Sequence, residues 1–198
     1  MNSMNENDVM MLKTPFHSRI EAACEINLWG NWMGYTTPDA YFDVELEYFA
    51  VRSTTGVFDL SPMNKYRISG PDAADFLDRM MTRNMHKLAI DRVAYVVWCN
   101  DAGQLMDDGT VFRLAENEYR LCSYARANDW LHWCSLGFDV TITDETAEVA
   151  ALAVQGPTSC STLTAMGLEG LQELKPFDIR NYSFDGEILS VSRTGFTG

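Results

Sequence analysis

Two adjacent carboxylates, Asp107 and Asp108, follow a turn in the segment QLMDDGTV and are the residues of this sequence best suited to proton transfer. Neighbouring residues of a strand point to opposite faces, so one of the two acids faces the buried or cavity side of its sheet. A carboxylate in a partly apolar cavity can have a shifted pKa and can pair with a cationic or protonated ligand. The alternative is that both acids face solvent beside the turn.

Other common catalytic patterns are absent from the sequence. It contains no G-x-G-x-x-G, no G-x-x-x-x-G-K-[ST], no H-E-x-x-H and no G-x-S-x-G. Its histidines, His17, His86 and His132, match no metal-ligand spacing. Dinucleotide-binding enzymes, P-loop NTPases, zinc enzymes and serine hydrolases are therefore poor candidates, and we expect no metal site.

The composition bounds the class of protein. The chain has 198 residues, 46% of them hydrophobic, which is enough apolar material for the core of one large domain or of two small ones. Its net charge is −13. Such an acidic chain lacks the electrostatic footprint of a general nucleic-acid or anionic-membrane binder. It also lacks an apolar run of ~20 residues and a secretory signal. The five cysteines form no C-x-x-C pair, which favours reduced thiols and a cytoplasmic location.

The helices and strands that must position the two acids follow one another in an irregular order, with several strands for each helix. Residues 93–99 and 104–114 flank the turn N-D-A-G and predict a β-hairpin. Further strands are expected at 65–70, 118–124, 140–143, 147–155, 179–184 and 187–193, and helices at 41–51, 74–81, 125–137 and 159–166. The start of the chain resembles a loop. This order predicts an α+β protein with mostly antiparallel sheets and packed helices.

Six segments in order resemble the folate-binding domain of the glycine-cleavage T-protein (aminomethyltransferase) superfamily, which also includes folate-dependent demethylases. They are TPFHSRI at 14–20, EYFAVRSTTGVFDLSPM at 47–63, ISGPDAADFLDRMMTRNM at 68–85, AYVVWCNDAGQLMDD at 94–108, LAVQGP at 152–157 and SVSRTGFTG at 190–198. The resemblance implies ferredoxin-like subdomains around a hole of tetrahydrofolate size. It also implies an N-terminal segment over 1–40 and a folate-binding domain over 41–198 that is truncated, without the C-terminal β-barrel of the family.

The resemblance assigns site residues by position. Asp108 matches the acid that lies near the reactive nitrogens of folate, which makes it the expected catalytic residue. Tyr95 matches a tyrosine that lines the folate pocket, whereas strand packing in the core would explain it without the family. Met63 is expected to pack on the pterin, with core filling as the alternative. Phe196 stands where many members have Tyr, and Ser123 replaces the usual asparagine of the pocket.

The function implied by the resemblance is a tetrahydrofolate-dependent one-carbon transferase that moves a methyl or methylene group from a small-molecule donor to folate. A true aminomethyltransferase would also need the lipoyl carrier protein as partner. The segment NLWGNWMGYTT, with Trp29 and Trp32, departs from the family pattern and favours the alternative of a demethylase acting on a sulfonium or methoxy-aromatic compound. Further alternatives are a non-catalytic folate-binding accessory protein and an inactive fragment.

Overall fold

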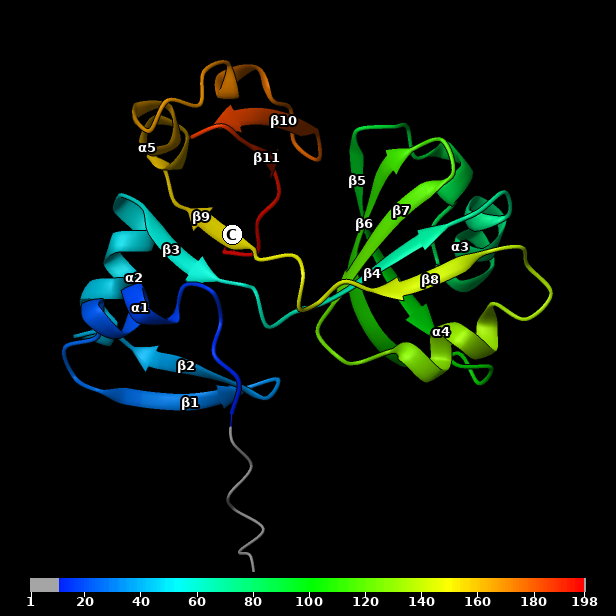
Figure 1. Ribbon diagram of the computed structural model, residues 1–198, viewed down its shortest axis with the longest axis horizontal. Coiled ribbons are helices and arrows are strands. Elements are labelled where there is room, and N and C mark those ends of the chain that lie inside the picture. Colours follow the sequence, from blue (N-terminus) through cyan, green and yellow to red (C-terminus); the bar gives the residue numbers. More distant parts are fainter. Residues whose placement is uncertain (1–10, 198) are drawn as a thin grey trace, which may run out of the picture.

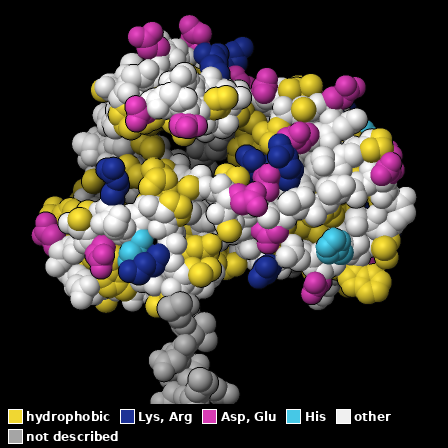
Figure 2. Space-filling view, viewed as in Figure 1, with side chains coloured by type: hydrophobic (Ala, Val, Ile, Leu, Met, Phe, Trp, Pro, Cys, Tyr) yellow, Lys and Arg dark blue, Asp and Glu magenta, His cyan; other side chains and the backbone are white. Residues whose placement is uncertain are grey.

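The computed structural model describes residues 11–197, which form three parts (Figure 1) around a hollow that is visible in the space-filling view (Figure 2). One part is a five-stranded sheet with two helices. The second combines the N-terminal hairpin, two helices and a two-stranded sheet. The third holds the C-terminal hairpin with one short helix. In the same view, hydrophobic side chains border the hollow between the part that carries the C-terminal hairpin and the rest of the molecule (Figure 2).

The five-stranded sheet has the order β5-β6-β7-β4-β8. All four of its strand pairings are antiparallel. Its strands are β4 (Asn64–Ser69), β5 (Arg92–Cys99), β6 (Leu105–Ala115), β7 (Glu118–Ser123) and β8 (Thr141–Asp144). The hairpin expected over 93–114 is thus present as β5 and β6, and it forms one edge of the sheet. The mostly antiparallel α+β class expected from the sequence is confirmed.

Within residues 11–197, helices cover only one face of this sheet. Helices α3 (Ala73–Met80) and α4 (Asn128–Cys134) supply Phe76, Leu77 and Leu131 to a core that includes the fully buried Tyr66 and Leu121. Figure 1 shows α3 and α4 on the side of the sheet away from the other two parts. Because strand side chains alternate between faces, every second residue of these strands points to the face without helices, toward the hollow.

The N-terminal part corrects one expectation. The stretch before residue 41, expected as a loop, contains α1 (His17–Ala23) and a hairpin of β1 (Leu28–Trp32) and β2 (Tyr35–Ala40). Met33 and Gly34 form the two-residue turn with φ of 55° and 84°, the left-handed geometry that tight hairpins require. The pair Met-Gly is not one of the common turn signals, which is why the hairpin escaped the sequence pattern.

The remaining elements connect these parts. Helix α2 (Val44–Ser53) begins at Asp43, whose side chain accepts a hydrogen bond from the backbone N–H of Leu46, as an N-cap should. Strand β3 (Gly56–Asp59) pairs with β9 (Leu152–Gln155), so the chain returns to the second part after the large sheet. The third part contains α5 (Ser159–Ala165) and the hairpin of β10 (Ile179–Phe184) and β11 (Glu187–Ser192). Short 3-10 turns occupy Met85–Lys87 and Leu171–Glu173.

Within residues 11–197, no helix has both the length and the apolar character needed to cross a membrane.

Candidate functional site

Tyr95 and Asp108 meet on the face of the sheet that no helix covers. The register pairs Tyr95 with Thr110 and Val97 with Asp108, so Tyr95 and Asp108 are diagonal neighbours on two adjacent strands. The Tyr95 hydroxyl donates a hydrogen bond of 2.8 Å to Oδ2 of Asp108. Tyr95 is 51% exposed, so its ring is accessible on this face of the sheet, and the alternative that it packs in the core is wrong.

The hydrogen bond affects the protonation of Tyr95. The pKa of Tyr95 is raised, chiefly because its hydroxyl donates to Asp108 and secondarily through desolvation and the negative charge of that carboxylate. The phenol therefore stays protonated as a hydrogen-bond donor near neutral pH. In the part of the chain that the structure describes, Oδ1 of Asp108 has no hydrogen-bond partner. A ligand N–H or protonated nitrogen can approach this second oxygen.

The neighbouring acid, Asp107, has a different role. It pairs with the buried Trp98 in the register, so its side chain points to the opposite face. Its carboxylate accepts hydrogen bonds from the backbone N–H groups of Asp108 and Ala125, each 2.9 Å long. The strand geometry thus separates the two acids as the alternation predicts. Asp107 fixes the local backbone, and Asp108 remains available for chemistry.

Gly109, the next residue of β6, was not singled out from the sequence. A Cβ atom at this position would lie 2.2 Å from the backbone oxygen of Cys122 on β7. Close approach of two backbones is a common reason for glycine inside a strand. The glycine that directly follows the acid pair in a strand-like segment was the available signal.

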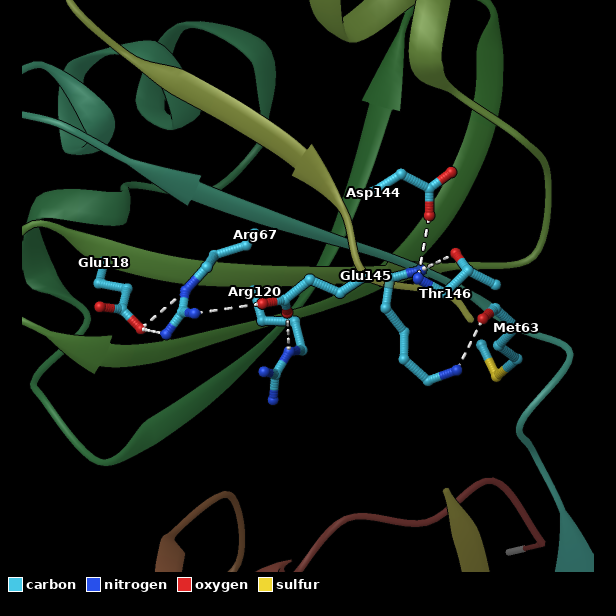
Figure 3. A network of polar contacts seen from close by, with 8 residues as sticks. Met63, Arg67, Glu118, Arg120, Asp144, Glu145 and Thr146 are labelled. Atoms are coloured by element: carbon cyan, nitrogen blue, oxygen red, sulfur yellow. Dashed lines mark hydrogen bonds and ion pairs between the residues drawn. The ribbon is translucent and has the colours of Figure 1, made fainter. Parts of the chain in front are cut away.

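Met63 and its backbone are held by a buried lysine. Met63 ends the turn between β3 and β4 and is half-buried. Lys65 is only 2% exposed, and its Nζ donates a hydrogen bond of 3.0 Å to the carbonyl of Ser61. A second hydrogen bond, of 2.9 Å, goes to the carbonyl of Met63 (Figure 3). Lys65 pairs with Cys122 in the register, which places its side chain on the helix-free face. The lysine therefore anchors the turn that presents Met63.

The buried ammonium makes a testable contribution to stability. Burial lowers the pKa of Lys65, and the charge of Arg120 lowers it further, against the opposing effects of Cys122, Asp59 and Asp144. In the unfolded chain the amine regains its usual pKa of 10.5, so just below that value the unfolded state binds more protons and stability rises with pH. Burial raises the pKa of Cys122 to about 11, so this thiol stays protonated through that window.

We therefore expect the free energy of unfolding of the unmodified protein, relative to a Lys65→Met variant, to increase as the pH rises toward 10.5. Urea unfolding of both proteins at pH values of about 7, 9 and 10 measures this difference. A difference that stays constant over this range would show that the ammonium is not destabilised in the fold.

A network of charges lies on the same face, on β7, which is next to the strand of Asp108, and on β4 beyond it. Arg67 on β4 forms an ion pair with Glu118, and its Nη1 lies 3.4 Å from Oε1 of Glu145 (Figure 3). Nε of Arg120 donates a 2.9 Å hydrogen bond to Oε2 of the same Glu145, which is 5% exposed. Two arginines therefore compensate one buried carboxylate, as a buried charge requires. The partners come from β4, β7 and the residue that follows β8, so no local sequence pattern indicates this network.

Ser123 and Phe196 lie apart from the Tyr95–Asp108 pair. Ser123 is fully buried on the helix-covered side of β7, and its hydroxyl donates to the carbonyl of Ala125 at 3.0 Å. Phe196 is 63% exposed and packs edge-to-face on Phe58 of β3, with 5.7 Å between ring centroids. The folate contacts of both residues stay predictions. The structure joins two of the five expected site residues directly.

Residues 21–198 match the family described as the GCVT N-terminal domain. The chain belongs to this family. The match covers almost the whole chain and confirms the resemblance that six separate segments carried. It includes β5 and β6, where Tyr95 and Asp108 lie.

Curated relatives of this GCVT-domain chain are aminomethyltransferases. The chain is 32% identical over 195 residues to the aminomethyltransferase of Shouchella clausii, covering 96% of this chain and 53% of that protein. It is 31% identical over 194 residues to that of Thermotoga maritima, covering 95% of this chain and 52% of that protein. The chain thus spans about half the length of the curated relatives that it matches.

Solved structures agree with the family. The glycine cleavage system aminomethyltransferase T from Bartonella henselae superposes with a TM-score of 0.74 at 26% identity, covering 86% of this chain and 47% of that one. A heterotetrameric sarcosine oxidase from a Corynebacterium species superposes with a TM-score of 0.53 at 14% identity, covering 76% of this chain and 77% of that one. The second likeness is one of fold alone. The expected T-protein fold is therefore confirmed.

Proposed function

We propose that the protein is a tetrahydrofolate-dependent one-carbon transferase, which moves a methyl or methylene group from a small-molecule donor to folate. The observation that carries the proposal is the Tyr95–Asp108 pair, an exposed aromatic ring bonded to a carboxylate on an uncovered sheet face. Membership of the GCVT-domain family and the aminomethyltransferase relatives support the same reaction class.

The residues present fit a reduced folate. A flat pterin needs an aromatic or apolar wall and polar groups for its ring nitrogens. The half-exposed ring of Tyr95 supplies such a wall, and Oδ1 of Asp108 is open to an N–H donor. The carboxylate also offsets positive charge on a protonated nitrogen. Met63, held from behind by Lys65, can close the apolar side of this site.

Each of these residues has a defined part in the reaction. Tetrahydrofolate, when bound, supplies the nitrogens that accept the one-carbon unit. Asp108 holds or accepts a proton at its free Oδ1, where proton transfer to or from a reacting nitrogen is needed. Tyr95 fixes the orientation of the carboxylate through its hydrogen bond to Oδ2 and flanks the ring system. A preoriented carboxylate does not need to reorganise when charge changes at the folate.

Two donor classes remain open within this proposal. An aminomethyltransferase would receive its one-carbon unit from the lipoyl carrier protein. A folate-dependent demethylase would act on a sulfonium or methoxy-aromatic compound, and aromatic walls suit such donors because a sulfonium is attracted to π faces. Trp29 and Trp32 lie on β1, both half-buried, and the Trp29 ring lies 5.2 Å from that of His17. Product analysis with each donor class separates the two reactions.

Binding of tetrahydrofolate is the first experiment. We expect saturable quenching of tryptophan fluorescence on titration with tetrahydrofolate. A Tyr95→Ala variant removes the ring wall and should bind about 5- to 50-fold more weakly, in line with the loss of one aromatic contact. A Tyr48→Ala variant is a matched control, since Tyr48 is also exposed but lies on α2. Absence of binding at high folate concentration would contradict both the transferase and the accessory-protein functions.

A further inference from the structure

The third part of the molecule, residues 157–193, meets the five-stranded sheet at one short junction beside the start of β5 (Figure 1). Arg92 of β5 lies opposite Asp178 as an isolated antiparallel bridge, and their side chains form an ion pair. Among residues 11–197, the direct polar contacts between the third part and the sheet are this ion pair and two backbone hydrogen bonds beside it. Three buried leucines of the third part lie outside the hydrophobic cluster of the sheet: Leu168, Leu171 and Leu174. The junction is therefore small, and it can open without disrupting the core of the sheet.

Both backbone hydrogen bonds of the junction are accepted by residues in a strained conformation. The Val93 N–H donates a hydrogen bond of 2.8 Å to the carbonyl of Phe177. The Ile179 N–H donates one of the same length to the carbonyl of Asp91. The φ angles of Asp91 and Phe177 are 60° and 65°, in the left-handed region that residues other than glycine rarely adopt. Such a conformation persists only while its surroundings hold it, so opening of the junction would release strain.

The junction also closes a ring formed by the three parts. On the side away from β5, the Phe177 N–H donates a hydrogen bond of 2.9 Å to the carbonyl of Arg193. Residues 193–197 then reach the second part, where Phe196 packs edge-to-face on Phe58 of β3. Opening of the junction would separate the third part from the sheet and widen the hollow between them, which hydrophobic side chains border (Figure 2).

We propose that Arg92 and Asp178 form a latch, which closes the ring of three parts and opens to admit a ligand to the hollow. The ion pair and the two backbone bonds favour the closed state, and the backbone strain opposes it. A ligand that contacts both the sheet and the rest of the ring binds the closed state more tightly, so its binding shifts the equilibrium toward closure. The opening of the latch does not depend on which ligand enters. Its coupling to tetrahydrofolate rests on the proposed function.

Hydrogen exchange of the unmodified protein without ligand is the first test. The amides of Val93 and Ile179 should exchange together, about tenfold or more faster than the hydrogen-bonded amides of β6 and β7, because the latch opens while the sheet stays folded. Tetrahydrofolate at ten times its Kd should slow both amides about tenfold, since it binds the closed state. Exchange of both amides at the rate of β6 and β7 without ligand would overturn the latch, because the junction would then open only with the whole sheet.

Substitutions of the ion pair test what holds the latch closed. Asp178→Asn keeps the shape of the side chain and removes its charge, so the amides of Val93 and Ile179 should exchange about threefold faster. Arg92→Gln should have the same effect, and the double variant should add little to either single change, because one interaction is lost in all three. The matched control Glu173→Gln removes an exposed ion pair within the third part and should leave both amides unchanged. Unchanged exchange in both single variants would overturn the latch.

A reversible disulfide tests whether the latch controls ligand entry. The two backbone hydrogen bonds flank Arg92 and Asp178, so these residues form a non-hydrogen-bonded pair, whose Cα atoms lie about 4.5 Å apart, a separation that a disulfide spans. In the variant Arg92→Cys/Asp178→Cys, the oxidised form is held closed and the reduced form lacks the ion pair. Tetrahydrofolate should associate about tenfold or more slowly with the oxidised form, and reductant should restore the rate. Unmodified protein treated with the same oxidant controls for the native cysteines.

The outcomes separate the latch from the proposed function. Equal association rates for the oxidised and reduced forms, with tetrahydrofolate bound by both, would overturn the latch and leave the proposed function intact. Absence of tetrahydrofolate binding to the unmodified protein would contradict the proposed function. Exchange at Val93 and Ile179 without ligand would then still decide whether the latch opens.

Discussion

Replacing Asp108 with Asn is expected to lower kcat for one-carbon transfer to tetrahydrofolate by about 10²-fold or more, with a much smaller change in folate affinity. Asparagine has nearly the same shape, and its amide oxygen can still accept the hydrogen bond from Tyr95. It carries no negative charge and takes up no proton at neutral pH. The loss therefore isolates the charge and proton-transfer role of the carboxylate from its packing.

The same variant has a readout that does not depend on activity. The pKa of Tyr95 is raised mainly by its hydrogen bond to the Asp108 carboxylate, so it should fall toward the usual 10.0 when the carboxylate becomes an amide. Ultraviolet difference titration of the variant against the unmodified protein measures this shift. Asp101→Asn is the matched control, because Asp101 is an exposed acid in the turn between β5 and β6. Full turnover by Asp108→Asn would remove the catalytic role that we assign.

Substitution of Gly109 with Ala is expected to have the largest effect on stability. The added Cβ would lie 2.2 Å from the backbone oxygen of Cys122 and 3.3 Å from its carbonyl carbon, so two paired strands must separate. Overpacking of this kind costs about 2–4 kcal/mol of the free energy of unfolding, which corresponds to a fall of about 5–15 °C in Tm for a domain of this size. The strand shift also moves Asp108, so folate binding should weaken.

Thermal and urea unfolding of Gly109→Ala measure this cost. Gly195→Ala is a matched control, since its Cβ would first meet the side-chain oxygen of Gln155, at 2.5 Å, and that flexible side chain can move away. We expect the control to lose less than about 1 kcal/mol. If both variants were equally stable, the close approach of β6 and β7 at Gly109 would not be a constraint on the fold.

The strand and helix pattern predicted most of the fold, for a physical reason that the β5–β6 hairpin illustrates. Ala94, Val96 and Trp98 are buried on one face while Tyr95 points to the other, and this alternation is already present in the order of side chains. The N-terminal hairpin was missed because its turn, Met33-Gly34, gives a weak local signal. Its two strands are stabilised by pairing with each other, and their sequences carry no distinctive strand pattern.

The candidate site was predicted less completely than the fold. The folate contact expected for Ser123 stays a prediction, and the strand register that pairs Ser123 with Gly109 buries its side chain on the helix-covered face, which its residue type did not indicate. Lys65 and the Arg67–Glu145–Arg120 network were not expected, because their partners lie far apart in the chain. Register and burial are properties of the assembled sheet, and a single residue type carries little information about either.

The sequence by itself determined the fold class, the family and the two acids, Asp107 and Asp108, that were candidates for proton transfer. Hydrophobic periodicity and the order of motifs are local properties, so they can be recognised in the amino-acid sequence without a structure. The resemblance singled out Asp108, and the tertiary structure supplied the physical reason: the register turns Asp107 toward backbone N–H groups and aims Asp108 at Tyr95 on an open face. It also brought Arg83 against the carbonyl of Tyr95, since the covering of a sheet edge depends on how distant segments pack.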